Sequence, residues 1–63
     1  MYVVKIKIGD IEQNLPTHYH LEDPEERKEF VEEDLSEYLG RPVKEKSFRI
    51  GKVVDFVLEL EWV

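Results

Sequence analysis

Apolar and polar residues alternate at the start of the chain, a pattern typical of a strand that buries one face. The apolar side comprises Val4, Ile6 and Ile8. The opposite side comprises Val3, Lys5 and Lys7. We therefore expect a strand over residues 2–8, with one face on a core and the lysines on the other face.

The next segment shows no such period, and Pro16 interrupts it. We expect a loop over residues 9–22 that a few apolar side chains attach to the core. An irregular connection of this length is uncommon in a compact domain, and it often carries a function or contains a short strand. The pattern alone leaves both alternatives open.

The middle of the chain carries the start and stop signals of a helix. Asp23 is the expected N-cap, Pro24 takes the first helical position, and Glu26 completes an Asp-x-x-Glu capping box. Gly40 is expected to end the helix in the left-handed conformation. The prediction is one helix over residues 24–39.

At about 100° per residue, this helix has an apolar half and an acidic half. The apolar half comprises Phe30, Val31, Leu35, Tyr38 and Leu39. The acidic half comprises Glu25, Glu26, Glu29, Glu32, Glu33 and Glu37, with Ser36 among them. Asp34 falls on the apolar half. We expect it either to reach water or a lysine at the edge of the sheet or to make an interface contact.

Two further strands are predicted over residues 43–50 and 53–62, as a hairpin around Gly51. One face of the last strand comprises Val54, Phe56, Leu58, Leu60 and Trp62. A three-residue loop would pair Phe48 with Phe56 and Arg49 with Asp55. Directly opposed residues share a face, so this register keeps apolar residues opposite apolar ones. A two-residue loop would instead pair Phe48 with Asp55 and put apolar and acidic residues on one face.

The first strand fits antiparallel beside the last strand, with Ile6 opposite Leu60 and Lys7 opposite Glu59. The predicted fold class is therefore α+β. It is a small β-α-β-β domain over residues 1–63, with a three-stranded sheet of order 1-3-2 and one amphipathic helix on one face. The expected core comprises Ile6, Val31, Leu35, Phe48, Phe56, Leu58 and Leu60.

The bulk composition narrows the class of protein. A chain of 63 residues forms one domain at most, and such a small core supplies about 3–5 kcal/mol. Cysteine is absent, so disulfides and thiolate metal sites are excluded. No signal-peptide or membrane-span pattern occurs, and we expect a cytoplasmic protein. A pI near 4.8 argues against nucleic acid and membranes as direct partners.

The negative charge is concentrated on the predicted helix. Residues 22–38 contain nine acidic and two basic residues, a net charge of −7 in a chain of net charge −6. Most runs of charged residues are only solvated surfaces. On this face, however, almost all the charges are negative, and the face is about 24 Å long. The candidate binding residues are Glu25, Glu29, Glu32, Glu33 and Glu37. They indicate a module that binds a basic protein surface, as a competitive inhibitor or nucleic-acid mimic.

The second face of the predicted sheet supports an alternative. It exposes Val3, Val53 and Val57, and nothing else in the chain is expected to cover it. Together with Asp34, these residues are candidates for an interface between copies of this chain. The alternative function is a homo-oligomeric accessory subunit, in the simplest case a homodimer.

The sequence contains no recognisable catalytic pattern. It lacks a glycine-rich phosphate loop, a nucleophile elbow and a cysteine nucleophile. His18 and His20 have the spacing of a metal-binding pair, but a site needs three or four ligands, and we expect surface histidines or a pH-sensitive contact. We therefore expect no metal, no cofactor and no enzymatic activity. An enzyme with an active site shared between subunits is the third hypothesis.

Overall fold

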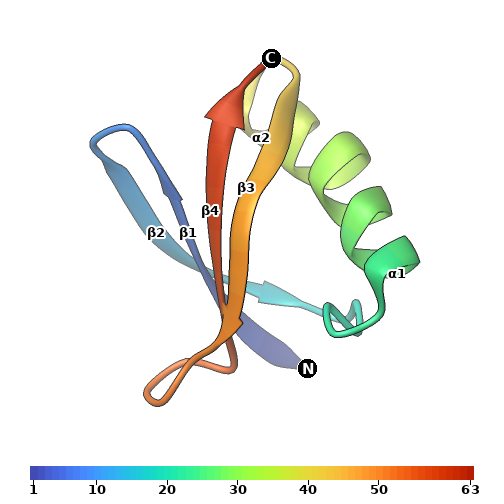
Figure 1. Ribbon diagram of the computed structural model, residues 1–63, viewed down its shortest axis with the longest axis vertical. Coiled ribbons are helices and arrows are strands. Elements are labelled where there is room, and N and C mark those ends of the chain that lie inside the picture. Colours follow the sequence, from blue (N-terminus) through green and yellow to red (C-terminus); the bar gives the residue numbers. More distant parts are fainter.

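The computed structural model describes residues 1–63 and has one helical layer on one face of a four-stranded sheet (Figure 1). The strands are β1 (Tyr2–Ile8), β2 (Ile11–Thr17), β3 (Val43–Ile50) and β4 (Phe56–Trp62). The helical layer is one continuous run of α1 (Pro24–Glu29), a π-helical segment η1 (Phe30–Leu35) and α2 (Ser36–Leu39). The α+β class and the single helix over residues 24–39 agree with the sequence prediction.

The sheet has the order β2-β1-β4-β3, so the predicted three-stranded order 1-3-2 is incomplete. The prediction of an antiparallel pair between β1 and β4 is wrong, because the two strands run parallel. Ile6 lies opposite Leu58 rather than Leu60, although Lys7 does lie opposite Glu59. The direction changes because β2 adds one reversal of the chain before the helix.

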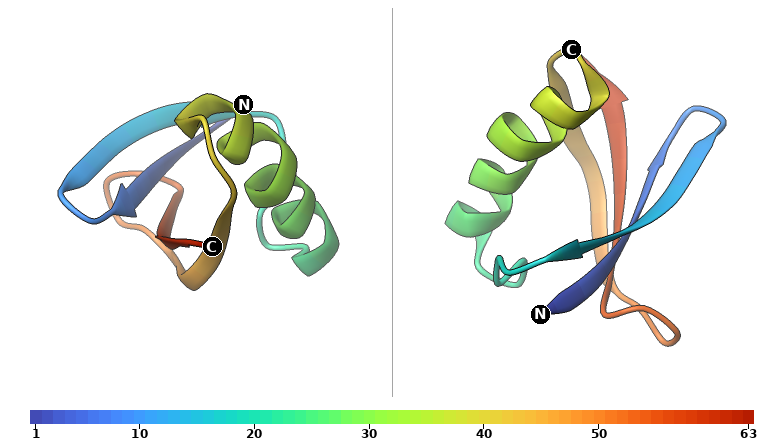
Figure 2. Two further views of the ribbon diagram at one scale, coloured as in Figure 1. Left: turned by 90° about the horizontal axis from the view of Figure 1, so that it is seen from above. Right: turned by 180° about the vertical axis from the view of Figure 1, so that it is seen from behind.

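The predicted loop over residues 9–22 contains strand β2. A turn at Gly9 and Asp10 folds it back antiparallel on β1, with Val4 opposite Leu15. Gly9 has a φ of 55°, a conformation that glycine adopts without steric cost. Most of β2 is exposed because it is an edge strand. The tip of this hairpin also splays away from the helix (Figure 2), so an apolar period was not required there.

The β3–β4 hairpin has a longer connection than predicted. β4 begins at Phe56 rather than at residue 53, and Phe48 pairs with Leu58 instead of Phe56. From Ser47 to Ile50 the register differs from the prediction by two residues, which keeps these side chains on the expected face. A bulge between Glu45 and Ser47 then shifts the register by one residue, so that Val43 and Glu45 rather than Lys44 share a face with Leu60 and Trp62. Asp55 is not opposite Arg49. It is held by β1 instead, where its backbone N–H donates to the Val3 carbonyl at 2.9 Å.

The helix ends form as the sequence indicates, with one change. The Asp23 side chain accepts the Glu25 N–H at 2.9 Å, and Gly40 ends the helix with a φ of 83°. The Glu26 carboxylate accepts the N–H of His20 at 3.2 Å rather than that of Asp23. The capping box is therefore replaced by a bond that ties the preceding turn to the helix.

The π-helical segment explains why two residues of the predicted apolar half are exposed. The hydrogen bonds in such a segment span five residues and widen the turn. Buried or half-buried positions then recur every four residues at Val31, Leu35 and Leu39. Asp34 and Tyr38 fall outside this stripe and are exposed. Tyr38 instead donates to Gln13 on β2 at 2.7 Å.

The core lies between the helix and the facing side of the sheet. Its buried residues are Val4, Ile6, Ile8, Leu21, Phe30, Val31, Leu35, Val43, Phe56, Leu58 and Leu60. Six of the seven residues predicted for the core are among them, and the seventh, Phe48, is half-buried against them. The centre of the sheet is thus assembled from alternate residues of β1 and β4.

Arg27 fastens the helix to β3. Its Nε donates to Glu45 at 2.6 Å, and its Nη1 donates to the Leu21 carbonyl at 2.8 Å. The guanidinium also lies 4.3 Å from the centre of the Phe48 ring. This arginine is therefore unavailable to neutralise the glutamates on the outer side of the helix.

Replacement of Leu35 tests the core. Leu35 is 1 % exposed, so Leu35→Ala should lower the free energy of unfolding by about 2–5 kcal/mol through lost burial and a residual cavity. Urea denaturation followed by circular dichroism measures this change. Val53→Ala, at a residue that is 99 % exposed, should change stability by less than about 0.5 kcal/mol. Equal midpoints for the two variants would contradict the described core.

Candidate protein-interaction surface

The outer side of the helix presents the five predicted glutamates to solvent. Glu25 and Glu29 lie on α1, Glu32 and Glu33 lie on η1, and Glu37 lies on α2. All five are exposed. We call this set the acidic face. The structure therefore brings the candidate residues together on one surface, although the helix is not a regular α-helix throughout.

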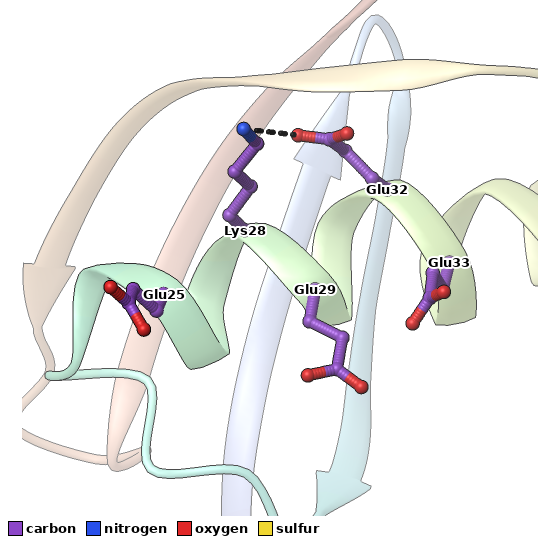
Figure 3. Close-up of a pocket in the computed structure, with 5 residues that line it drawn as sticks. All are labelled: Glu25, Lys28, Glu29, Glu32 and Glu33. Atoms are coloured by element: carbon purple, nitrogen blue, oxygen red, sulfur yellow. Dashed lines mark ion pairs between the residues drawn. The ribbon is translucent and has the colours of Figure 1, made fainter.

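Figure 3 shows four of these glutamates with Lys28 along the exposed surface of the helix. These five residues line a shallow depression that contains no hydrophobic side chain. Lys28 Nζ lies 3.9 Å from Glu32 Oε2, a long ion pair between two exposed groups. Such a pair contributes little, so most of the negative charge on the acidic face is uncompensated by the chain itself.

The helix dipole favours negative charge at only one end of the helix. Glu25 lies in the first turn, where the helix dipole stabilises a carboxylate. Glu37 lies in the last segment, where the dipole opposes it. Neighbouring glutamates one turn apart also repel one another, by about 0.2–0.5 kcal/mol a pair. The helix tolerates this cost because its stability comes from burial of the opposite side.

Asp34 belongs to the edge of the acidic face rather than to the core. It is exposed, and its Oδ1 accepts a hydrogen bond of 3.4 Å from the Tyr19 hydroxyl. Desolvation raises the pKa of Tyr19, and the negative charges of Asp34 and Glu29 raise it further. Asp34 is thus neither buried nor unpartnered, and it links the segment before the helix to the acidic face.

The two histidines do not come together as a metal site. His20 Nδ1 lies 3.1 Å from the Tyr2 hydroxyl, and their rings meet edge to face at a centroid distance of 5.4 Å. His18 is exposed. The structure contains no group of three or more histidine, aspartate or glutamate side chains that could hold a metal ion.

The sheet face opposite the helix is less open than the sequence suggests. Val57 was expected there as an exposed interface residue, but it is only 5 % exposed. Val3 is 40 % exposed and Val53 is 99 % exposed. Val57 lies on the central strand β4 between Lys5 of β1 and Arg49 of β3, and it lines a recess with residues of the loop 51–55. The alternation within one strand does not reveal these neighbours.

Sequence reasoning also missed a group of cations around Val57. Lys5, Arg49 and Lys52 come from β1, β3 and the β3–β4 loop and line one recess on this face. The sequence analysis placed Lys5 on the polar face of the first strand and paired Arg49 with Asp55, and it assigned no role to Lys52. The only feature of the sequence that points to this group of cations is that all three lie outside the acidic segment, in the part of the chain whose net charge is close to zero.

Comparison of the chain with protein-family models, with curated protein sequences and with solved structures finds no significant match. None of the helical segments has the length and apolar character needed to cross a bilayer. The class of protein therefore has to be inferred from the surfaces themselves.

Titration of Tyr19 tests the geometry at the edge of the acidic face. Its pKa should lie above the ordinary value of 10.0. Because the folded-state pKa exceeds the unfolded one, stability from this group is present below pH 10 and is lost as pH rises through the folded pKa. Carbon NMR of the tyrosine rings as a function of pH measures the shift.

Two variants separate the causes of this shift. Asp34→Asn should move the Tyr19 pKa part of the way back, because burial remains as the first cause. Glu37→Gln removes a charge that does not contribute to the shift and serves as the control. An unchanged Tyr19 pKa in the Asp34→Asn variant would show that the two side chains do not interact.

Proposed function

We propose that this protein is a non-enzymatic binding module that engages a basic surface of a partner protein through its acidic face. One observation carries the proposal: five exposed glutamates share one helix surface, and only Glu32 forms an ion pair within the chain. The partner would supply the missing positive charge.

The physical argument concerns charge density and shape. The carboxylates from Glu25 to Glu37 form a row about 18 Å long, at 1.5 Å of helix per residue. The field of this row extends about 8–10 Å into solution at moderate salt. A basic groove that normally holds a phosphate backbone is complementary to such a row. The most specific form of the proposal is therefore a competitive inhibitor that imitates nucleic acid.

Because the acidic face has no apolar lining, binding through it would depend on electrostatic attraction, which sets its rate and its dependence on salt. Contacts between exposed charges speed association and set orientation more than they slow dissociation. They also weaken as salt is raised, because screening acts on charges that remain near water. Binding through the acidic face should thus be fast and strongly dependent on ionic strength.

The alternative proposal is a homo-oligomeric accessory subunit that uses the sheet face. Its support is the 99 % exposure of Val53 together with the 40 % exposure of Val3. The burial of Val57 removes the residue that was expected at the centre of that contact. Association through the remaining valines would depend only weakly on salt, which separates the two proposals.

Charge-neutral variants of the acidic face test the main proposal. Glu29, Glu32 and Glu33 changed together to Gln keep size and helix propensity and remove three charges. The matched control is Asp10→Asn with Glu59→Gln and Glu61→Gln, which removes three charges outside the helix. Immobilised parent, variant and control are exposed to extract of the native host at low and at high salt, and retained proteins are identified by mass spectrometry.

The parent and the control should retain the same basic proteins at low salt and release them at high salt. The helix variant should retain them at least about tenfold less, the effect of losing roughly 0.5 kcal/mol for each of three charges. Retention of the same proteins by the helix variant would show that the acidic face is only solvated. Retention that survives high salt would favour the sheet face.

A further inference from the structure

The sheet face opposite the helix contains a recess that combines apolar walls with positive charge. It lies beside the loop 51–55, which projects from the end of the sheet away from the helix (Figure 1). The recess has a volume of ≈ 470 Å³, within the range of about 300–1,000 Å³ typical of small-molecule sites. Its apolar walls comprise Ile50, Val53, Val54 and Val57.

One wall of this recess is held in place by hydrogen bonds. The Gly51 N–H donates to the Asp55 carbonyl at 3.1 Å, and the Asp55 N–H donates to the Val3 carbonyl at 2.9 Å. The Asp55 carboxylate accepts the Val3 N–H at 2.7 Å. The loop is thereby closed on itself and attached to β1, so the recess is built into the fold.

The positive charge of the recess is largely unused by the chain. Lys5 pairs with Glu12 at 3.4 Å, but neither Arg49 nor Lys52 forms an ion pair within the protein. The nearby carboxylate of Asp55 is occupied by Val3. In a chain of net charge −6, two unpaired cations beside buried Val57 form a local surface of the opposite sign.

A second copy of this chain does not complement the recess. A symmetric contact through this face would bring the cations of both copies into one interface, where like-charge repulsion opposes association. The acidic face of another copy supplies negative charge, but the depression on it has no hydrophobic side chain to cover the valines. The complementary ligand needs both an anion and an aliphatic part.

We propose that this recess binds an aliphatic carboxylate, with the chain on the valines and the carboxylate between Arg49 and Lys52. The guanidinium of Arg49 suits a carboxylate because its planar donors match the two oxygens. The accessible apolar surface for the aliphatic part comes from Ile50, Val53 and Val54. The same chemistry occurs in a free fatty acid and in the terminal residue of an aliphatic peptide.

Amide proton–nitrogen correlation NMR of the full chain tests this site with octanoate as the probe. Octanoate should cause saturable shifts concentrated at residues 49–54, Lys5 and Val57, with a dissociation constant on the order of 1 mM. Acetate lacks the chain and octanol lacks the charge, so each should bind at least about fivefold more weakly. N-acetyl-valyl-leucine, with a free carboxylate, distinguishes a peptide end from a fatty acid by its relative affinity.

Paired variants separate specific binding from adsorption. Arg49→Gln with Lys52→Gln should weaken octanoate binding by about fivefold, as expected for two partly exposed charge interactions. Lys44→Gln with Lys46→Gln removes the same charge from β3 outside the recess and should bind like the parent. Equal affinity for octanol and octanoate, equal affinity of both double variants, or shifts spread over the protein would each overturn the proposal.

Discussion

The parallel pairing of β1 with β4 is the interaction on which the other parts of this structure depend. Ile6 and Leu58 lie opposite each other at the centre of the sheet, and both are fully buried. The helix buries Val31 and Leu35 in the cluster that these two strands form together with Val43 of β3. Burial on that side leaves the acidic face as the outer surface of the protein.

The two proposed binding surfaces are therefore on opposite sides of the sheet and have opposite charge. The acidic face is exposed because the helix buries its other side, and Arg27 is turned inward to Glu45. The cationic recess exists because Asp55 draws the loop 51–55 onto β1 beside Val3. A carboxylate ligand and a basic partner could occupy the protein together, because neither surface uses residues of the other.

Side-chain patterns predicted the faces of elements better than the pairing between them. The β3–β4 register differed by two residues between Ser47 and Ile50, and the direction of β1 relative to β4 was reversed, yet Phe56, Leu58 and Leu60 still face the helix. The reason is that the period of a strand is two, so an even shift conserves its faces. Opposed charges such as Lys7 and Glu59 satisfy either direction and cannot discriminate between them.

Local signals in the amino-acid sequence determined the helix ends, the apolar stripe of β1 and β4, and the glutamates that share one surface. Gly9-Asp10 between two extended runs is also a hairpin signal, but β2 lacks an apolar period because only Leu15 and Thr17, near its end, are covered. Only the tertiary structure decided the parallel pairing of β1 with β4, the widened helical turn that exposes Asp34, and the burial of Val57 between β1 and β3. These features depend on contacts such as Asp55 with Val3, whose partners are far apart in the chain and follow no local period.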